Sequence, residues 1–174
     1  MFNSIVAAFD GSPTATRALE IAADLAARDE LPLGIIYVVD LKHMQIPDEF
    51  RRMGEVEHII DPKPKMPFTY EDLPTHIIGS MAEKAEETQH TLSQFGEFIL
   101  KQAEDDAGRA GVKQLETRIM TGNPAAKILE YASARGADLI VVGSHGFGPL
   151  KRLLLGSTSQ KVAQQAESSC LTVR

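Results

Sequence analysis

Three short runs of residues constrain this chain more than any other feature, because they are almost entirely apolar and do not alternate with polar residues. They occupy residues 4–9, 33–39 and 138–142. A strand that is apolar at every position is buried on both faces, which is typical of the inner strands of a parallel sheet. Parallel neighbours need a long crossover between them, usually a helix. The runs therefore predict an α/β fold with a helix after each strand.

The expected helices have recognisable starts. Ser12 and Asn123 are good N-capping residues, and each is followed by a proline, which suits the first helical position. Two more helices are expected, one over residues 81–111 and one after Gly156. Helices and strands then alternate along the chain, as they do in a doubly wound sheet.

Two further strands complete the expected sheet. Residues 114–120 alternate polar and apolar side chains, which predicts an edge strand, and residues 170–173 form a short apolar strand near the end. We predict a single-domain, Rossmann-like, open five-stranded parallel sheet in the order 3-2-1-4-5, with helices on both faces. The strand order would reverse between strands one and four, where ligands bind in such sheets. Asp10 and Gly143 would then face each other across one crevice.

The stretch of about residues 41–80 departs from this regularity. It holds five of the nine prolines and has no steady apolar period. Long irregular segments inside compact domains are usually functional or mobile. We expect it to be an insertion within one nucleotide-binding domain that spans residues 1–174.

Composition excludes several classes of protein. The 174 residues carry a net charge of −6, which argues against a nucleic-acid partner. No apolar run is long enough to insert into a membrane, and the first residues do not resemble a secretion leader. A single cysteine rules out an internal disulfide. We therefore expect a cytoplasmic location.

The loop after residue 142 is the most motif-like part of the chain. Gly143 and Gly146 would allow a ligand to approach the backbone closely. Gly156 and Ser157 stand at a predicted helix start, where free amides and the helix dipole attract phosphate. The same residues could instead form a glycine-rich turn and a serine cap with no ligand. His145 has no acid or nucleophile placed to make a triad with it, so we expect a solvent-facing loop histidine.

The common phosphate-binding motifs do not fit this loop. Its first glycines have the spacing of a P-loop, but Pro149 stands where the P-loop lysine should be. No G-x-G-x-x-G follows the first strand, which weakens a dinucleotide interpretation.

A third pattern does fit, and it is Gly143-x2-Gly146-x9-Gly156-Ser157. With residues 6–12, 37–40, 141–146 and 154–157, it resembles the universal stress protein family, in particular its ATP-binding branch. The resemblance covers the chain except for roughly residues 41–80.

The resemblance implies an adenine-nucleotide site and a role for each residue that forms it. The implied ligand contacts are Ala8, Asp10, Val38, Val142, Gly143, Gly146, Gly156, Ser157, Thr158 and Ser159. Ala8 and Val38 would flank the adenine with Val142 beneath it, and Asp10 would contact the ribose or a metal near the phosphates. The glycines and serines would hold the ribose and phosphates, and Thr158 would contribute its backbone.

The expected function is that of a stress-response binding module, not an enzyme. Its ligand would be ATP, with or without Mg²⁺, and an unidentified protein partner would respond to occupancy. A slow ATPase or nucleotide hydrolase in the same site remains the alternative. The short strand at residues 170–173 leaves one edge open, and family members commonly dimerise there, so a homodimer through this strand is expected.

Overall fold

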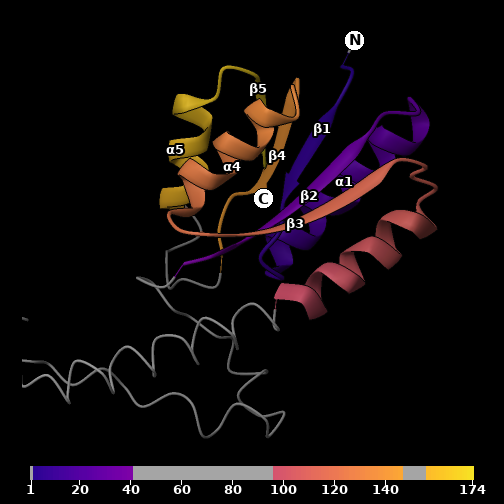
Figure 1. Ribbon diagram of the computed structural model, residues 1–174, viewed down its shortest axis with the longest axis horizontal. Helices are drawn as coiled ribbons and strands as arrows, with labels where there is room; N and C mark the ends of the chain where they lie inside the picture. Colours follow the sequence, from indigo (N-terminus) through magenta and orange to yellow (C-terminus); the bar gives the residue numbers. More distant parts are fainter. Residues whose placement is uncertain (1, 41–95, 147–155) are drawn as a thin grey trace, which may run out of the picture.

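The computed structural model describes residues 2–40, 96–146 and 156–174, and these residues form one twisted parallel sheet (Figure 1). Its strands are β1 (Ile5–Ala8), β2 (Leu33–Val39), β3 (Leu115–Thr121), β4 (Leu139–Gly143) and β5 (Ser169–Val173). Every neighbouring pair is parallel, and the spatial order is β3-β2-β1-β4-β5. The predicted fold class and strand order are thereby confirmed.

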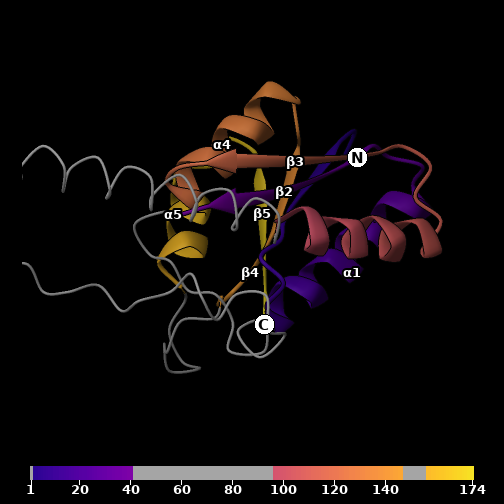
Figure 2. The same ribbon diagram turned by 60° about the horizontal axis from the view of Figure 1, so that its bottom comes forward.

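Helices cover both faces of the sheet, as Figures 1 and 2 show. The labelled helices are α1 (Pro13–Arg28), α4 (Pro124–Ala134) and α5 (Ser157–Gln165). A further helix occupies residues 96–109 and packs with α1 on one face, while α4 and α5 pack on the other. The insertion expected at 41–80, the start of the helix expected from residue 81, and the loop 147–155 lie outside the described residues.

The sheet separates two apolar cores, because successive residues of each strand point to opposite faces. In β1, Ile5 and Ala7 face α1, whereas Val6 and Ala8 face α4 and α5. Alanines dominate the buried side of α1, so little side-chain volume separates this helix from the sheet. Main-chain atoms of α1 can therefore come very close to neighbouring strands.

The helix starts differ in how they are capped. The Ser12 hydroxyl accepts a hydrogen bond from the Ala15 amide at 3.3 Å, and the Asn123 side chain accepts one from Ala126 at 3.1 Å. These are the two caps that the sequence predicted. Gly156 precedes α5 and supplies no side-chain cap. All three helices begin at the edge of the sheet where the strands have their carboxyl ends.

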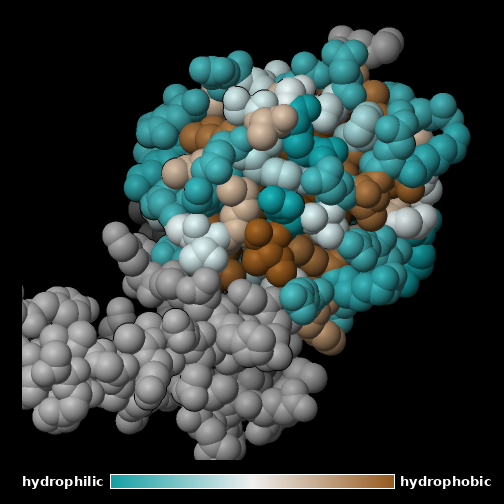
Figure 3. Space-filling view, in the orientation of Figure 1, coloured by the Kyte–Doolittle hydropathy of each residue, from teal (hydrophilic) through white to brown (hydrophobic). Residues whose placement is uncertain are grey.

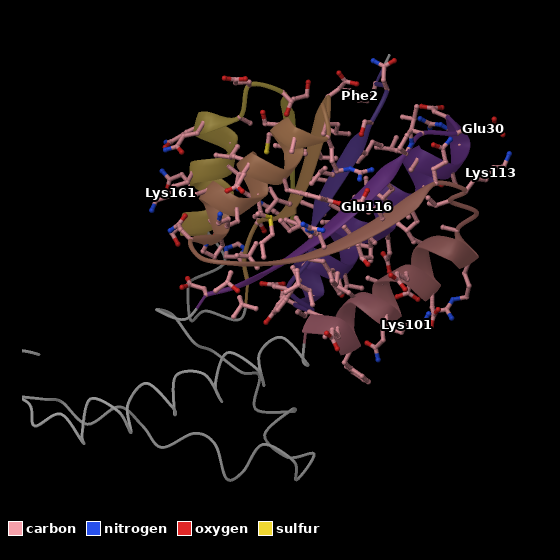
Figure 4. All side chains as sticks on the ribbon, viewed as in Figure 1. Phe2, Glu30, Lys101, Lys113, Glu116 and Lys161 are labelled. Atoms are coloured by element: carbon pink, nitrogen blue, oxygen red, sulfur yellow. The ribbon has the colours of Figure 1, made fainter. Side chains whose placement is uncertain are left out.

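Two charged pairs lie at the opposite edge of the sheet. Lys113, just before β3, pairs with Glu30 after α1, and Figure 4 shows both side chains at this edge. Arg135 after α4 pairs with Glu116 near the start of β3. These ion pairs lie at the amino ends of the strands, away from the edge where α1, α4 and α5 begin.

Candidate functional site

The reversal of strand order puts Asp10 and the glycine loop side by side. β1 pairs with β4 so that Ala8 is opposite Val142, and each strand then ends within two residues. A Cβ atom added to Gly146 would lie 2.6 Å from Oδ2 of Asp10. The carboxylate thus rests directly against the Gly146 backbone, as the predicted crevice requires.

The Asp10 carboxylate is largely shielded from solvent. Its Oδ1 accepts a hydrogen bond from the Ser12 amide at 2.9 Å. Burial raises the pKa of Asp10 above its ordinary value, although hydrogen bonds from Ser12 act in the opposite direction. Burial also raises the pKa of Tyr37, and the charge of Asp10 raises it further. Asp10 therefore shapes the turn before α1 and also has the perturbed ionisation that is common at functional sites.

Gly143 has a packing role that needs no ligand. A Cβ atom there would lie 2.8 Å from the Ala15 amide nitrogen and 2.8 Å from Oγ1 of Thr14. The loop is also tied to α1 through the His145 carbonyl, which accepts hydrogen bonds from Oγ1 of Thr14 and, at 3.3 Å, from the Ser12 hydroxyl. A ligand that moves this loop would therefore also change the hydrogen bonds at the start of α1. Thr14 was not predicted from the sequence, although a hydroxyl in the first turn after Asp10 is a recognisable signal.

The two glycine-containing halves of the loop meet at Ser144. Its carbonyl accepts hydrogen bonds from the Gly156 amide at 2.7 Å and from the Ser159 hydroxyl at 3.1 Å. The Ser159 hydroxyl is also 2.9 Å from the Gly156 carbonyl, and Ser159 is buried. Its hydroxyl is therefore engaged by the loop backbone and serves to hold the two halves together.

The start of α5 lies beside this junction and presents its first main-chain amides there. The first amides of any helix lack partners within the helix, and no side chain of the described residues caps them here. Ser157 is exposed and Thr158 is half-buried. A Cβ atom on Gly156 would lie 3.7 Å from the His145 Cα, so this helix end adjoins the first half of the loop. Such an end attracts anions, phosphate in particular.

The three apolar residues predicted to contact adenine share one face of the sheet. Ala8, Val38 and Val142 all pack on the side of α4 and α5. Val38 keeps part of its surface accessible, whereas Ala8 and Val142 are buried. Met120 of β3 is the partner of Val38 in the ladder and is also half-buried on this face. It was missed from the sequence, although the alternation of β3 could have placed it there.

His145 differs from the expected solvent-facing residue. Its Nδ1 lies 2.8 Å from the Ser144 hydroxyl oxygen, and its Nε2 is buried with no hydrogen-bond partner among the described residues. The ring turns back toward its neighbour because the fully buried Ser144 hydroxyl needs a partner.

A groove elsewhere on the molecule is less suited to a specific ligand. It has a volume of about 440 Å³ and lies between the helix of residues 96–109 and β3, where Figure 3 shows apolar surface bordered by hydrophilic side chains. Two of its charged side chains are paired with each other or with a neighbour, since Glu104 accepts from Thr117 at 2.7 Å and pairs with Lys101 at 3.6 Å. At the carboxyl edge, the first amides of α5 have no side-chain cap among the described residues, so we regard this edge as the candidate site.

Within residues 2–40, 96–146 and 156–174, no group of three or more His, Cys, Asp and Glu side chains could hold a metal ion. In the same ranges, no helix combines the length and apolarity needed to cross a bilayer.

Comparison with known proteins gives consistent matches along the chain. The sequence profile described as "Universal stress protein family" matches residues 1–66 and 55–174. Universal stress protein YxiE of Bacillus subtilis (strain 168) is 33% identical over 174 residues, which cover 100% of both chains. Among solved structures, universal stress protein UspA from Lactobacillus plantarum has a TM-score of 0.71 at 21% identity and covers 99% of this chain and 97% of its own. A universal stress protein in complex with cAMP has a TM-score of 0.59 at 23% identity, with coverage of 99% and 97%.

Proposed function

This chain belongs to the universal stress protein family, and from that premise we propose that it is a stress-response binding module that takes up ATP at the carboxyl edge of its sheet. The observation that carries the proposal is the junction at Ser144. There the glycine loop is bonded to the start of α5, whose first amides have no side-chain cap. A site for phosphate is thus assembled beside Asp10 and next to an apolar surface.

Each part of a nucleotide has a complementary surface in this proposal. The phosphates lie at Gly156, Ser157 and Thr158, where helix amides and the exposed Ser157 hydroxyl can donate hydrogen bonds. Ser159 acts indirectly, by holding the loop in place. The ribose lies against Asp10 and Gly146, since a carboxylate is a good acceptor for sugar hydroxyls.

The adenine lies on the accessible surface of Val38, above the buried Ala8 and Val142. Gly143 lies beneath the ribose, but the close approach of α1 already explains why no side chain fits there. The solved relative in complex with cAMP supports an adenine nucleotide as the class of ligand. Mg²⁺ would be held by the phosphates and Asp10, because this ion typically takes one or two carboxylates together with phosphate oxygens.

Binding rather than turnover is the favoured role. Efficient hydrolysis needs a group placed to activate water. Asp10, the carboxylate of the proposed site, is engaged by the Ser12 amide and is assigned to the ribose or metal. A slow ATPase in the same site is the alternative, and measured turnover separates the two.

The proposal is tested by the ligand that accompanies the native protein. Mass spectrometry of protein purified without added nucleotide should detect an adenine nucleotide in a one-to-one complex. Calorimetry on stripped protein should then show binding of ATP and much weaker binding of GTP. Stripped protein that binds neither nucleotide, or both equally well, would contradict the assignment.

We also propose that the protein is a homodimer joined through β5. Among the described residues, no strand pairs with the outer edge of β5, and Leu171 on this strand is 38% exposed. The Ser169 amide donates a hydrogen bond to the main-chain carbonyl of Asp138, just before β4. The Val173 carbonyl accepts one from the main-chain amide of Ser144, just after β4. The main-chain N–H and C=O groups of successive residues in a strand point in opposite directions within the sheet. Those of Leu171 therefore also point toward β4, whereas those of Thr172 point toward the free edge.

A further inference from the structure

Two buried side-chain nitrogens in the described ranges have no hydrogen-bond partner, and they have different explanations. Nε of Arg135 belongs to a guanidinium that pairs with Glu116 and lies 5.5 Å from the ring centre of Tyr131, so its charge is already compensated. Nε2 of His145 has no such compensation and lies in the glycine loop. A buried polar atom without a partner usually marks a strained, functional or ligand-binding position.

The hydrogen bond on the other side of the ring fixes what Nε2 can do. Ser144 is fully buried, and the neighbour of its hydroxyl in the described residues is Nδ1 of His145 at 2.8 Å. We assign the Ser144 hydroxyl as the donor and Nδ1 as the acceptor, because the described residues offer this hydroxyl no other acceptor. In this tautomer the hydrogen of the imidazole is on Nε2. Nε2–H is then a buried donor without an acceptor among the described residues.

The position of His145 is fixed by its backbone. Its carbonyl is held by Ser12 and Thr14 at the start of α1. Its Cα lies 3.7 Å from the place where a Cβ of Gly156 would be, and Gly146 follows it against Asp10. The residue therefore lies between the proposed ribose and phosphate regions, and the contact of Nδ1 with the Ser144 hydroxyl orients the ring.

We propose that Nε2–H of His145 donates a hydrogen bond to a phosphate oxygen of the bound nucleotide, and that His145 thereby selects phosphorylated ligands over nucleosides. This inference rests on the proposed function, since it names a further contact in the same site. An anionic oxygen suits this donor because charge-assisted hydrogen bonds are the strongest kind. The uncapped start of α5 favours an anion at the same place.

A matched pair of variants isolates this contact. In His145→Asn the amide can still pair with the Ser144 hydroxyl but cannot reach the position of Nε2. In His145→Gln the longer side chain can place an amide donor near that position. Calorimetry with ATP and with adenosine should show that His145→Asn weakens ATP binding roughly 10- to 100-fold, the range for a hydrogen bond to a charged group. Adenosine binding should be unchanged, and His145→Gln should recover most of the ATP affinity.

The possible outcomes separate this inference from the proposed function. If wild-type protein binds neither ATP nor adenosine, both the proposed function and the inference are wrong. If the wild type binds ATP but His145→Asn binds it equally well, or loses ATP and adenosine affinity alike, only the inference is wrong. If His145→Asn does not fold, ¹⁵N NMR of the wild-type imidazole decides. ATP, but not adenosine, should then shift the Nε2 resonance, and identical spectra with both ligands would overturn the inference.

Discussion

Two glycines of the same loop should respond differently to the addition of one methyl group. Neither Gly143 nor Gly146 has a φ in the left-handed region, so alanine is compatible with both backbones. What differs is the atom that the new Cβ would meet. At Gly143 it is the main chain of α1, with Ala15 N at 2.8 Å, and at Gly146 it is the carboxylate tip of Asp10 at 2.6 Å.

The contacts set the expected magnitudes. Backbone of a packed helix cannot move aside cheaply, so Gly143→Ala should lower the free energy of unfolding by about 1–3 kcal/mol, as overpacking does. In Gly146→Ala the Asp10 carboxylate must retreat by about 0.8 Å to reach ordinary contact, which costs about 0.5–1.5 kcal/mol through an off-rotamer side chain. Reduced entropy of the unfolded chain offsets about 0.4–1 kcal/mol of this. Gly146→Ala should therefore fold almost as stably as the wild type but bind ATP roughly 10- to 100-fold more weakly, because Asp10 is displaced.

Urea unfolding and ATP calorimetry on the same samples test both expectations. Gly108→Ala is the control, because a Cβ on this exposed helical glycine would meet nothing within 4 Å. It should gain about 0.5–1 kcal/mol of stability from helix propensity and leave ATP binding unchanged. A Gly143→Ala protein as stable as the wild type, or a Gly146→Ala protein that binds ATP normally, would contradict these expectations.

Three further predictions concern ionisation, turnover and assembly. Because burial raises the pKa of Asp10 above 3.8, its contribution to stability is present at low pH and is lost as the pH rises through the folded-state pKa. Asp10→Asn should therefore be more stable than the wild type at pH 7 and lose that advantage below about pH 4, and urea titrations showing a less stable variant at pH 7 would contradict this. ATP turnover should be far below about 10 per second, and a faster rate that disappears in Asp10→Ala would make the protein an enzyme. Thr172→Pro removes a donor from the free edge and should give a folded monomer by light scattering, whereas Leu171→Pro breaks pairing with β4 and should unfold the sheet. A Thr172→Pro protein that stays dimeric would exclude β5 as the interface.

The sheet could be predicted from the sequence because each signal is local. Apolar runs give buried strands, and Ser12 and Asn123 followed by proline give helix starts. The order 3-2-1-4-5 then brings Asp10 to the glycine loop without any knowledge of distances. Strand bounds differ from the expectation by about one residue, as expected for local signals.

Details of the site could not be predicted because they depend on contacts between distant parts of the chain. The sequence does not show that a side chain at position 143 would collide with α1. This becomes visible only from the distance between β4 and Ala15. The Ser159 hydroxyl appears available to a ligand until its bond to Ser144 is seen. The burial of His145 Nε2 and the outward direction of Thr172 also follow from packing and register rather than from residue type.

We propose that ATP binds at the carboxyl edge, between the Asp10 turn and the start of α5. Titration of ¹⁵N-labelled protein with ATP and magnesium, followed by amide NMR, tests it directly. Saturating shifts are predicted for residues 8–14, 142–146 and 156–160, with the start of α1 included because Thr14 is bonded to the His145 carbonyl. The groove between the helix of residues 96–109 and β3 should be unaffected. Shifts centred on that groove, or no saturable shifts at all, would contradict the account.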